Sequence, residues 1–178
     1  MKKIILPLIC LLLFATCKKE EEEIIIPSIT YPTFEGYILT DIDGTTLGNQ
    51  GNDTTDWELD NSSWLDIEKS LFTNYNNLIH NYNSDFNTSL YNPCPNPTIN
   101  NIVMFPFNEL DSTISFDIRF VNQQFTKVKD FSLNLSSNNI IFLLDSIQTS
   151  NNELVRAYYT FTRNDTCFHK GFGDIMFE

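Results

Sequence analysis

A strict alternation of apolar and polar residues over 114–120 constrains the fold more than any other feature of the chain. Ile114, Phe116, Ile118 and Phe120 alternate with polar residues, so an extended segment here has one apolar face for a core and one polar face. Further alternating or apolar runs lie at 102–105, 131–135, 140–144, 154–162 and 175–177. Short strands at this spacing, separated by turn residues, predict a mainly β protein built as a β-sandwich.

The residues before this region indicate one short helix among long loops. Trp64, Ile67 and Leu71 fall on one helical face after the capping residues Asn61-Ser62-Ser63, so a helix is expected over 64–72. The stretch 41–56, rich in Gly, Thr, Asn and Asp, and the many asparagines over 74–92 predict long Asn-rich loops.

A resemblance adds to this fold prediction. The segment Asn92-Pro93-Cys94-Pro95-Asn96-Pro97-Thr98, with the alternating strands after it, resembles the opening of immunoglobulin-like sandwich domains in secreted Bacteroidota proteins, in particular the sorting domains of type IX secretion. The likeness covers 92–162 and implies an immunoglobulin-like β-sandwich. The end of the chain, 167–178, departs from the Gly-rich, Lys-ending sorting pattern, so only the fold is taken from it. The expected domains are a loop and helix extension over 31–91, packed on a β-sandwich domain over 92–178.

The N-terminus is typical of a secretory signal peptide. Lys2 and Lys3 precede an apolar run over 4–14, which is too short to span a bilayer core that needs about 20 residues. Phe14-Ala15-Thr16-Cys17 resembles a lipobox, the cleavage site of bacterial lipoproteins. That resemblance implies removal of residues 1–16 and attachment of a diacylglycerol to Cys17, which anchors the protein to a membrane. The alternative is an ordinary signal peptide that is cut nearby.

Residues 17–30 are expected to form an acidic tether. Lys18-Lys19 and the four glutamates after them cannot be buried and remain solvated. A lipidated cysteine followed by lysine and acidic residues also resembles the signal that sends some Bacteroidota lipoproteins to the cell surface. The expected location is therefore the outer membrane, surface-exposed or otherwise facing the periplasm.

The charge of the chain excludes one class of partner. The formal net charge is −12, and loss of Lys2 and Lys3 with the leader makes the mature chain more acidic still. Such a surface repels nucleic acid, so a protein or glycan partner is expected in addition to the membrane. No sequence motif indicates a cofactor.

Two cysteines remain in the mature chain besides Cys17. Cys94 and Cys167 are expected to form a disulfide, because paired thiols are common outside the cytoplasm; two free thiols are the alternative. His80 and His169 are the other soft ligands, but their spacing does not indicate zinc, and both are expected to be surface histidines.

The segment Asp41-Ile42-Asp43-Gly44-Thr45 follows an apolar stretch and resembles the first motif of haloacid-dehalogenase-type phosphatases. That resemblance implies Asp41 as nucleophile and Asp43 as acid/base, with magnesium. The family also needs parallel strands alternating with helices, which the later sequence does not predict. A polar turn is the expected structure, and a secreted magnesium-dependent phosphatase or hydrolase is the alternative function.

The sequence contains two further candidate binding sites. Asp41, Asp43 and Asp53 are candidates for an irregular calcium loop, although the EF-hand spacing is absent. Trp57 and Trp64, with Tyr75 and Tyr82, could form a glycan-binding platform, although packing in a core is the commoner use of such residues. The expected function is that of a non-catalytic envelope lipoprotein with a binding or structural domain, or a glycan-binding surface lipoprotein.

Overall fold

The alternating residues form the centre of a β-sheet, as predicted. In the computed structural model, which describes residues 31–178 except 53–55, 83–89, 109–112 and 145–151, the side chains of Ile114, Phe116, Ile118 and Phe120 are all buried. They point to one side of a central strand, and the polar residues between them point to the other. Tyr31–Glu178 forms one compact unit. The prediction of a mainly β protein is confirmed.

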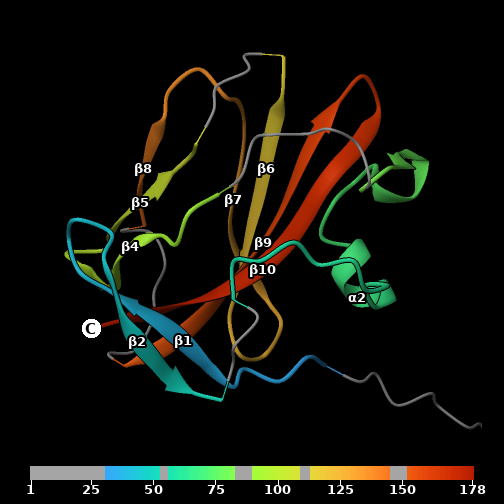
Figure 1. Ribbon diagram of the computed structural model, residues 1–178. Helices are drawn as coiled ribbons and strands as arrows, with labels where there is room; N and C mark the ends of the chain where they lie inside the picture. The colour runs from blue at the N-terminus through green and yellow to red at the C-terminus, as the bar shows by residue number, and fades with distance from the viewer. Residues whose placement is uncertain (1–30, 53–55, 83–89, 109–112, 145–151) are drawn as a thin grey trace, which may run out of the picture. The chain divides into compact units, whose positions relative to one another are not determined.

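Ten strands in the described part of the chain form a mixed sheet with the order β2-β1-β4-β10-β9-β6-β7 (Figure 1). Most neighbours are antiparallel, but β10 pairs in parallel with β4 and with β3. The strands are β1 Gly36–Thr40, β2 Thr46–Gly51, β3 Ile79–His80, β4 Cys94–Ile99, β5 Ile102–Pro106, β6 Ser115–Val121, β7 Lys127–Asn134, β8 Asn139–Leu143, β9 Glu153–Arg163 and β10 Thr166–Phe177.

The main core lies on one face of β6, β9 and β10. Strands β5 and β8 pair with each other and lie over this face (Figure 1). Phe105 of β5 contacts Phe120 of β6 at 6.4 Å between ring centroids, and Phe142 of β8 contacts Phe131 of β7 at 4.4 Å. Aromatic pairs from both layers therefore fill the space between them.

A second core lies on the opposite face of the sheet. Trp64, Phe72 and Tyr75 pack there against Tyr158 of β9 and Val121 of β6. The segment 64–75, which lies between β2 and β4 in the sequence, thus covers the outer side of β6 and β9. Trp57, from the same part of the chain, belongs to the main core. Residues from 31–91 and from 92–178 share both cores, and the boundary between these two predicted domains stays a prediction.

The helix is shorter than the sequence predicts. It is α2, Asp66–Lys69, followed by a 3-10 turn at Tyr75–Asn77. Leu65 takes the N-cap position. The buried carboxylate of Glu68 accepts hydrogen bonds from the Leu65 backbone N–H and from the Tyr158 hydroxyl. Trp64 lies outside the helix, where its ring packs against both Phe72 and Tyr75. These tertiary contacts override the helical spacing.

The predicted disulfide between Cys94 and Cys167 is wrong in this structure, where both are free and buried thiols. Phe177 at the end of β10 pairs with Thr98 at the end of the parallel β4. Strand β4 thus meets the last residue of β10, whereas Cys167 lies ten residues earlier, near the start of β10. Disulfides need Cα atoms within about 7 Å. Burial raises the pKa of Cys167 to about 11, so this thiol stays protonated at neutral pH.

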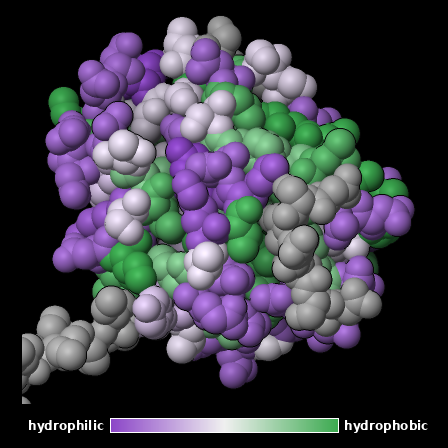
Figure 2. Space-filling view, turned by 180° about the vertical axis from the view of Figure 1, so that it is seen from behind, coloured by the Kyte–Doolittle hydropathy of each residue, from purple (hydrophilic) through white to green (hydrophobic). Residues whose placement is uncertain are grey.

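Apolar side chains also reach the surface. The pairing of β4, β5 and β8 places Ile99, Ile102 and Leu143 next to one another, all three exposed. Figure 2 shows hydrophobic patches on the surface seen from behind, separated by hydrophilic residues. No helix among the described residues is long and apolar enough to cross a membrane.

Candidate functional site

The aspartates of the phosphatase-like motif lie in the turn between β1 and β2. One carboxylate oxygen of Asp41 accepts hydrogen bonds from the backbone N–H groups of Asp43 and Thr45, at 3.0 and 2.8 Å. Gly44, with φ +83°, supplies the left-handed backbone that the turn needs. These strands are antiparallel, whereas the phosphatase resemblance requires parallel strands alternating with helices. The predicted polar turn is confirmed.

The calcium loop receives no support from this geometry. Asp53 lies outside the described residues, as do Cys17, the leader 1–16 and the tether 17–30. Within the described part of the chain, no group of three or more His, Cys, Asp or Glu side chains could hold a metal ion.

The two tryptophans do not form a surface platform. Trp57 and Trp64 are 4% and 3% exposed, so the prediction of an accessible pair is wrong. Trp57 lies against the backbone of Gly173, where an added Cβ would come within 2.2 Å of the indole ring, and its ring stacks on Tyr159. Gly173 thus makes room for Trp57 in the core. Core packing is the use of these tryptophans that the sequence analysis set beside the platform.

One of the two histidines is partly buried. His80 in β3 is exposed as predicted, but His169 lies within β10, where its ring contacts Tyr159 and Phe161 at 5.7 and 5.3 Å between centroids. Burial lowers the pKa of His169 to about 4, so the imidazole is neutral at pH 7. His169 is thus less exposed than the sequence predicts, because β10 continues through 169.

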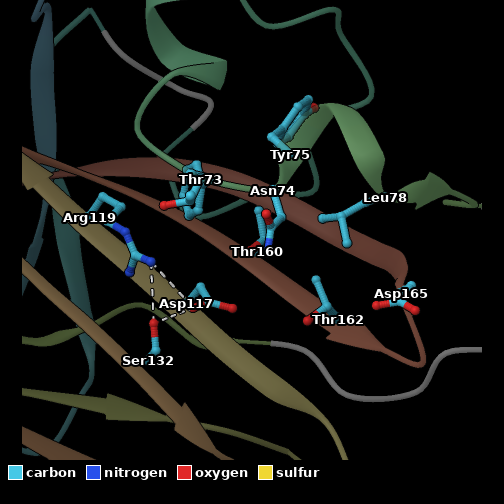
Figure 3. A pocket seen from close by; sticks show the side chains of 11 residues that line it. Thr73, Asn74, Tyr75, Leu78, Asp117, Arg119, Ser132, Thr160, Thr162 and Asp165 are labelled. Carbon is cyan, nitrogen blue, oxygen red and sulfur yellow. Dashed lines mark hydrogen bonds and ion pairs between the residues drawn. The ribbon is translucent and has the colours of Figure 1, made fainter.

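The strongest candidate site is a cavity on the outer face of the sheet, which we call the sheet cavity (Figure 3). Its volume is about 340 Å³, and its floor is formed by β6, β7 and β9. Residues of the 72–78 segment form its other wall, and in Figure 3 Tyr75 and Leu78 stand across from the strands. Small-molecule sites have volumes of about 300–1,000 Å³, so this cavity lies at the lower end of that range.

The floor of the sheet cavity is a cross-strand row of polar residues. Thr160 of β9, Asp117 of β6 and Ser132 of β7 are direct neighbours in the strand register. Neighbours in such a row have Cβ atoms about 5 Å apart on the same face of the sheet. Thr162 of β9 lies in the next row, so two threonine hydroxyls and a carboxylate face the same space.

The charged residues of the floor hold one another in place. Asp117 accepts hydrogen bonds from the hydroxyl of Ser132 and from the guanidinium of Arg119 (Figure 3). It also accepts one from the hydroxyl of Ser115. Arg119 also donates to the backbone carbonyls of Ile118 and Phe131, at 2.9 and 2.7 Å. A ligand would therefore meet polar groups whose positions are already fixed, which lowers the entropic cost of binding.

The sequence contained part of the signal for this site. The alternation that buries Phe116 and Ile118 also turns Asp117 and Arg119 to the opposite face, and an oppositely charged pair there could have been singled out. Thr160 and Thr162 carried no comparable signal, since 154–162 resembles a continuous buried run. Of the residues singled out from the sequence, only Tyr75 borders the sheet cavity.

Comparisons with known proteins add little. No protein-family model matches the chain, and the search of curated proteins found no match. Among solved structures, the crystal structure of an FMN-binding beta-glucuronidase from Facaelibacterium prausnitzii L2-6 is similar at a TM-score of 0.35 and 12% sequence identity. That match covers 55% of this chain and 16% of the enzyme. We infer neither fold nor activity from a likeness of this level.

Proposed function

We propose that the protein is a non-catalytic envelope lipoprotein, anchored to the outer membrane through Cys17, that binds a hydroxyl-rich ligand such as a saccharide in the sheet cavity. The observation that carries the binding function is the cavity itself, with its preorganised row of Thr160, Asp117 and Ser132. The location rests on the lipobox-like leader and acidic tether alone.

The chemistry of the lining favours a saccharide. Sugars offer many hydroxyl groups, which both donate and accept hydrogen bonds and so match carboxylate, amide and hydroxyl side chains. The sheet cavity contains all three kinds: the carboxylate of Asp117, the amide of Asn74 and the hydroxyl of Thr162. Phe72 and Tyr75 also line the cavity, but each is only 7% exposed, so polar contacts rather than ring stacking would hold the sugar.

The same lining favours binding over catalysis. Ser132 donates its hydroxyl to Asp117, whose carboxylate also accepts hydrogen bonds from Ser115 and Arg119 and so holds the floor together. None of the described residues that line the sheet cavity is a histidine. The phosphatase alternative depends on Asp41, whose carboxylate instead accepts the backbone hydrogen bonds of its own turn.

The immunoglobulin-like sandwich is retained as part of this proposal. It is supported by the packing of β5 and β8 over β6, β7 and β9. The parallel pairing of β10 with β4 and β3 is a feature that any sandwich topology for this chain must include.

Substitutions in the floor of the sheet cavity test the binding function. Asp117→Asn keeps the shape of the side chain but removes its charge, and we expect about tenfold weaker binding to the saccharides that the wild type retains on a glycan array. A hydrogen bond to a charged group contributes about 1.5 kcal/mol or more, which corresponds to about that factor. Isothermal titration with the best array ligand provides the dissociation constants.

Asp43→Asn, at an exposed aspartate of the β1–β2 turn, is the matched control and should leave the affinity unchanged. Thr162→Val should also weaken binding, whereas Thr126→Val on an exposed turn should not. Equal affinities for wild type, D117N and T162V would exclude the sheet cavity as the binding site.

The lipid anchor predicts a defined mass. Protein from the membrane fraction should begin at Cys17 and exceed its polypeptide mass by a diacylglyceryl group, with or without a further acyl chain. Cys17→Ser should release the protein from the membrane, and Cys94→Ser should leave it attached. Intact-mass spectrometry decides this point, because an unmodified thiol at Cys17 or a different N-terminus contradicts the anchor.

A further inference from the structure

A second cavity neighbours the sheet cavity, because the two share a lining residue. Its volume is about 390 Å³, and we call it the lysine cavity because Lys69 and Lys170 line it together with His80 and Tyr82. Tyr75 borders both cavities. A ligand that is longer than one sugar ring could therefore contact both cavities around this tyrosine.

The two lysines are held differently. Lys170 lies in β10 with its side chain only 1% exposed, and its ammonium donates to the Ser62 carbonyl at 2.6 Å and to the Asp60 carboxylate at 3.3 Å. Lys69 is more accessible, at 26% exposure, and pairs with the fully exposed Asp66 at 3.0 Å. An exposed pair of this kind is weak, so Lys69 can turn toward a bound anion at little cost.

Aromatic rings surround the buried ammonium. The Lys170 nitrogen lies 4.6 Å from the centre of the Trp64 ring and 5.6 Å from that of Tyr82. Burial lowers the pKa of Lys170, while the nearby Asp60 opposes this effect. An anion in the cavity would favour the charged form in the same way that Asp60 does.

The charges of the two cavities differ. Asp117 and Asp165 line the sheet cavity, balanced only by Arg119. No carboxylate is among the described residues that line the lysine cavity, where both charged side chains are cationic. Each lysine pairs with an aspartate outside this lining, Asp66 or Asp60, so the surroundings are close to neutral as a whole. The charged groups that face the cavity itself are nevertheless both cationic, which matches an anionic group.

We propose that the lysine cavity binds the anionic group of an acidic saccharide whose neutral part occupies the sheet cavity. This inference rests on the proposed saccharide-binding function and specifies its ligand class. Carboxylate and sulfate are the anions that saccharides commonly carry, and both accept hydrogen bonds from ammonium groups. The side chains of Lys69 and Lys170 provide the selectivity, and the threonine and aspartate row provides contacts to hydroxyl groups.

A glycan array that presents each neutral saccharide beside its uronate or sulfated counterpart tests the inference with the full-length protein. We expect at least tenfold tighter binding to the acidic member of a pair. Lys69→Gln should reduce this preference at least threefold, and Asp117→Asn should weaken binding to both members. Lys127→Gln is the matched control, because Lys127 also pairs with an aspartate three residues away, at 2.7 Å, and should change nothing.

Inorganic sulfate, followed by tryptophan fluorescence at constant ionic strength with chloride as reference, isolates the lysine cavity because Trp64 lies beside Lys170. Sulfate binding that is lost in K69Q, without saccharide binding on the array, would keep the anion site but overturn its saccharide ligand. Equal binding of neutral and acidic saccharides would overturn the inference and leave the proposed function standing. An acidic preference that K69Q does not alter would also overturn it.

Discussion

Arg156→Met is expected to lower the free energy of unfolding by about 3–5 kcal/mol, the usual cost of leaving one partner of a buried ion pair alone. Arg156 of β9 and Asp174 of β10 are direct cross-strand neighbours with side chains 4% and 0% exposed. Two guanidinium nitrogens donate to the two carboxylate oxygens, each at 2.7 Å. Methionine keeps the apolar stem but leaves the Asp174 carboxylate without this partner.

The surroundings of the pair explain why the chain cannot relax around the change. The guanidinium lies between the rings of Phe34 and Phe172, at 4.7 and 4.6 Å from their centres. The Asp174 backbone N–H donates to Asp56, and its carbonyl accepts from the Asn96 side chain. One buried network thus links β4, β9, β10 and the chain at 56, so a local loss affects several elements together.

Urea denaturation followed by fluorescence measures this effect. Arg156→Lys should cost less than Arg156→Met, because a lysine keeps the charge but not the two parallel hydrogen bonds. Lys127→Gln breaks an exposed ion pair with Asp130 and should change stability by less than about 1 kcal/mol. An R156M variant within 1 kcal/mol of the wild type would show that the pair contributes no more than a surface pair.

The strands could be predicted where the pattern was local. The period of two over 114–120 correctly assigned the buried residues of β6, because alternation depends only on the strand itself. The stretch 41–56 was expected to be a loop, yet it contains β2, whose Thr, Gly and Asn composition gives no strand signal. Strand β2 forms because it pairs with β1, and such a pairing depends on two segments rather than on the composition of one.

The order of the strands needed information that no single segment contains. The parallel pairing of β10 with β4 makes neighbours of Phe177 and Thr98, which are far apart in the sequence. The disulfide prediction was wrong for the same reason, since nothing in the spacing of Cys94 and Cys167 reports which ends of two strands they occupy.

The candidate site was predictable only in part. Asp117 and Arg119 follow from the alternation of β6, but Lys170 does not, because lysine is almost never fully buried without a partner. Its partner Asp60 is 110 residues away in the sequence. A surface platform of the two tryptophans with Tyr75 and Tyr82 was one possibility beside core packing; the tryptophans are in fact buried, and both tyrosines line the lysine cavity.

The partly buried His169 is expected to make the protein sensitive to mild acid. Burial lowers its pKa in the folded state to about 4, against about 6.5 in the unfolded chain. Between these values the unfolded chain binds a proton that the folded chain does not, so stability falls as the pH drops from 6.5 toward 4. One pKa unit corresponds to about 1.4 kcal/mol, and the total contribution of His169 is therefore about 3 kcal/mol.

His169→Phe isolates this contribution, because a phenyl ring retains the contacts with Tyr159 and Phe161 but cannot be protonated. The stability of H169F relative to the wild type should rise by about 3 kcal/mol between pH 7 and pH 4, as measured by urea denaturation at each pH. Tyr159→Phe removes the hydroxyl that lies 3.5 Å from the imidazole and leaves His169 in place. It should therefore lower stability by a similar amount at both pH values. If H169F and the wild type lose stability in parallel as the pH falls, His169 is already protonated in the folded protein and carbonyl or carboxylate groups must solvate it.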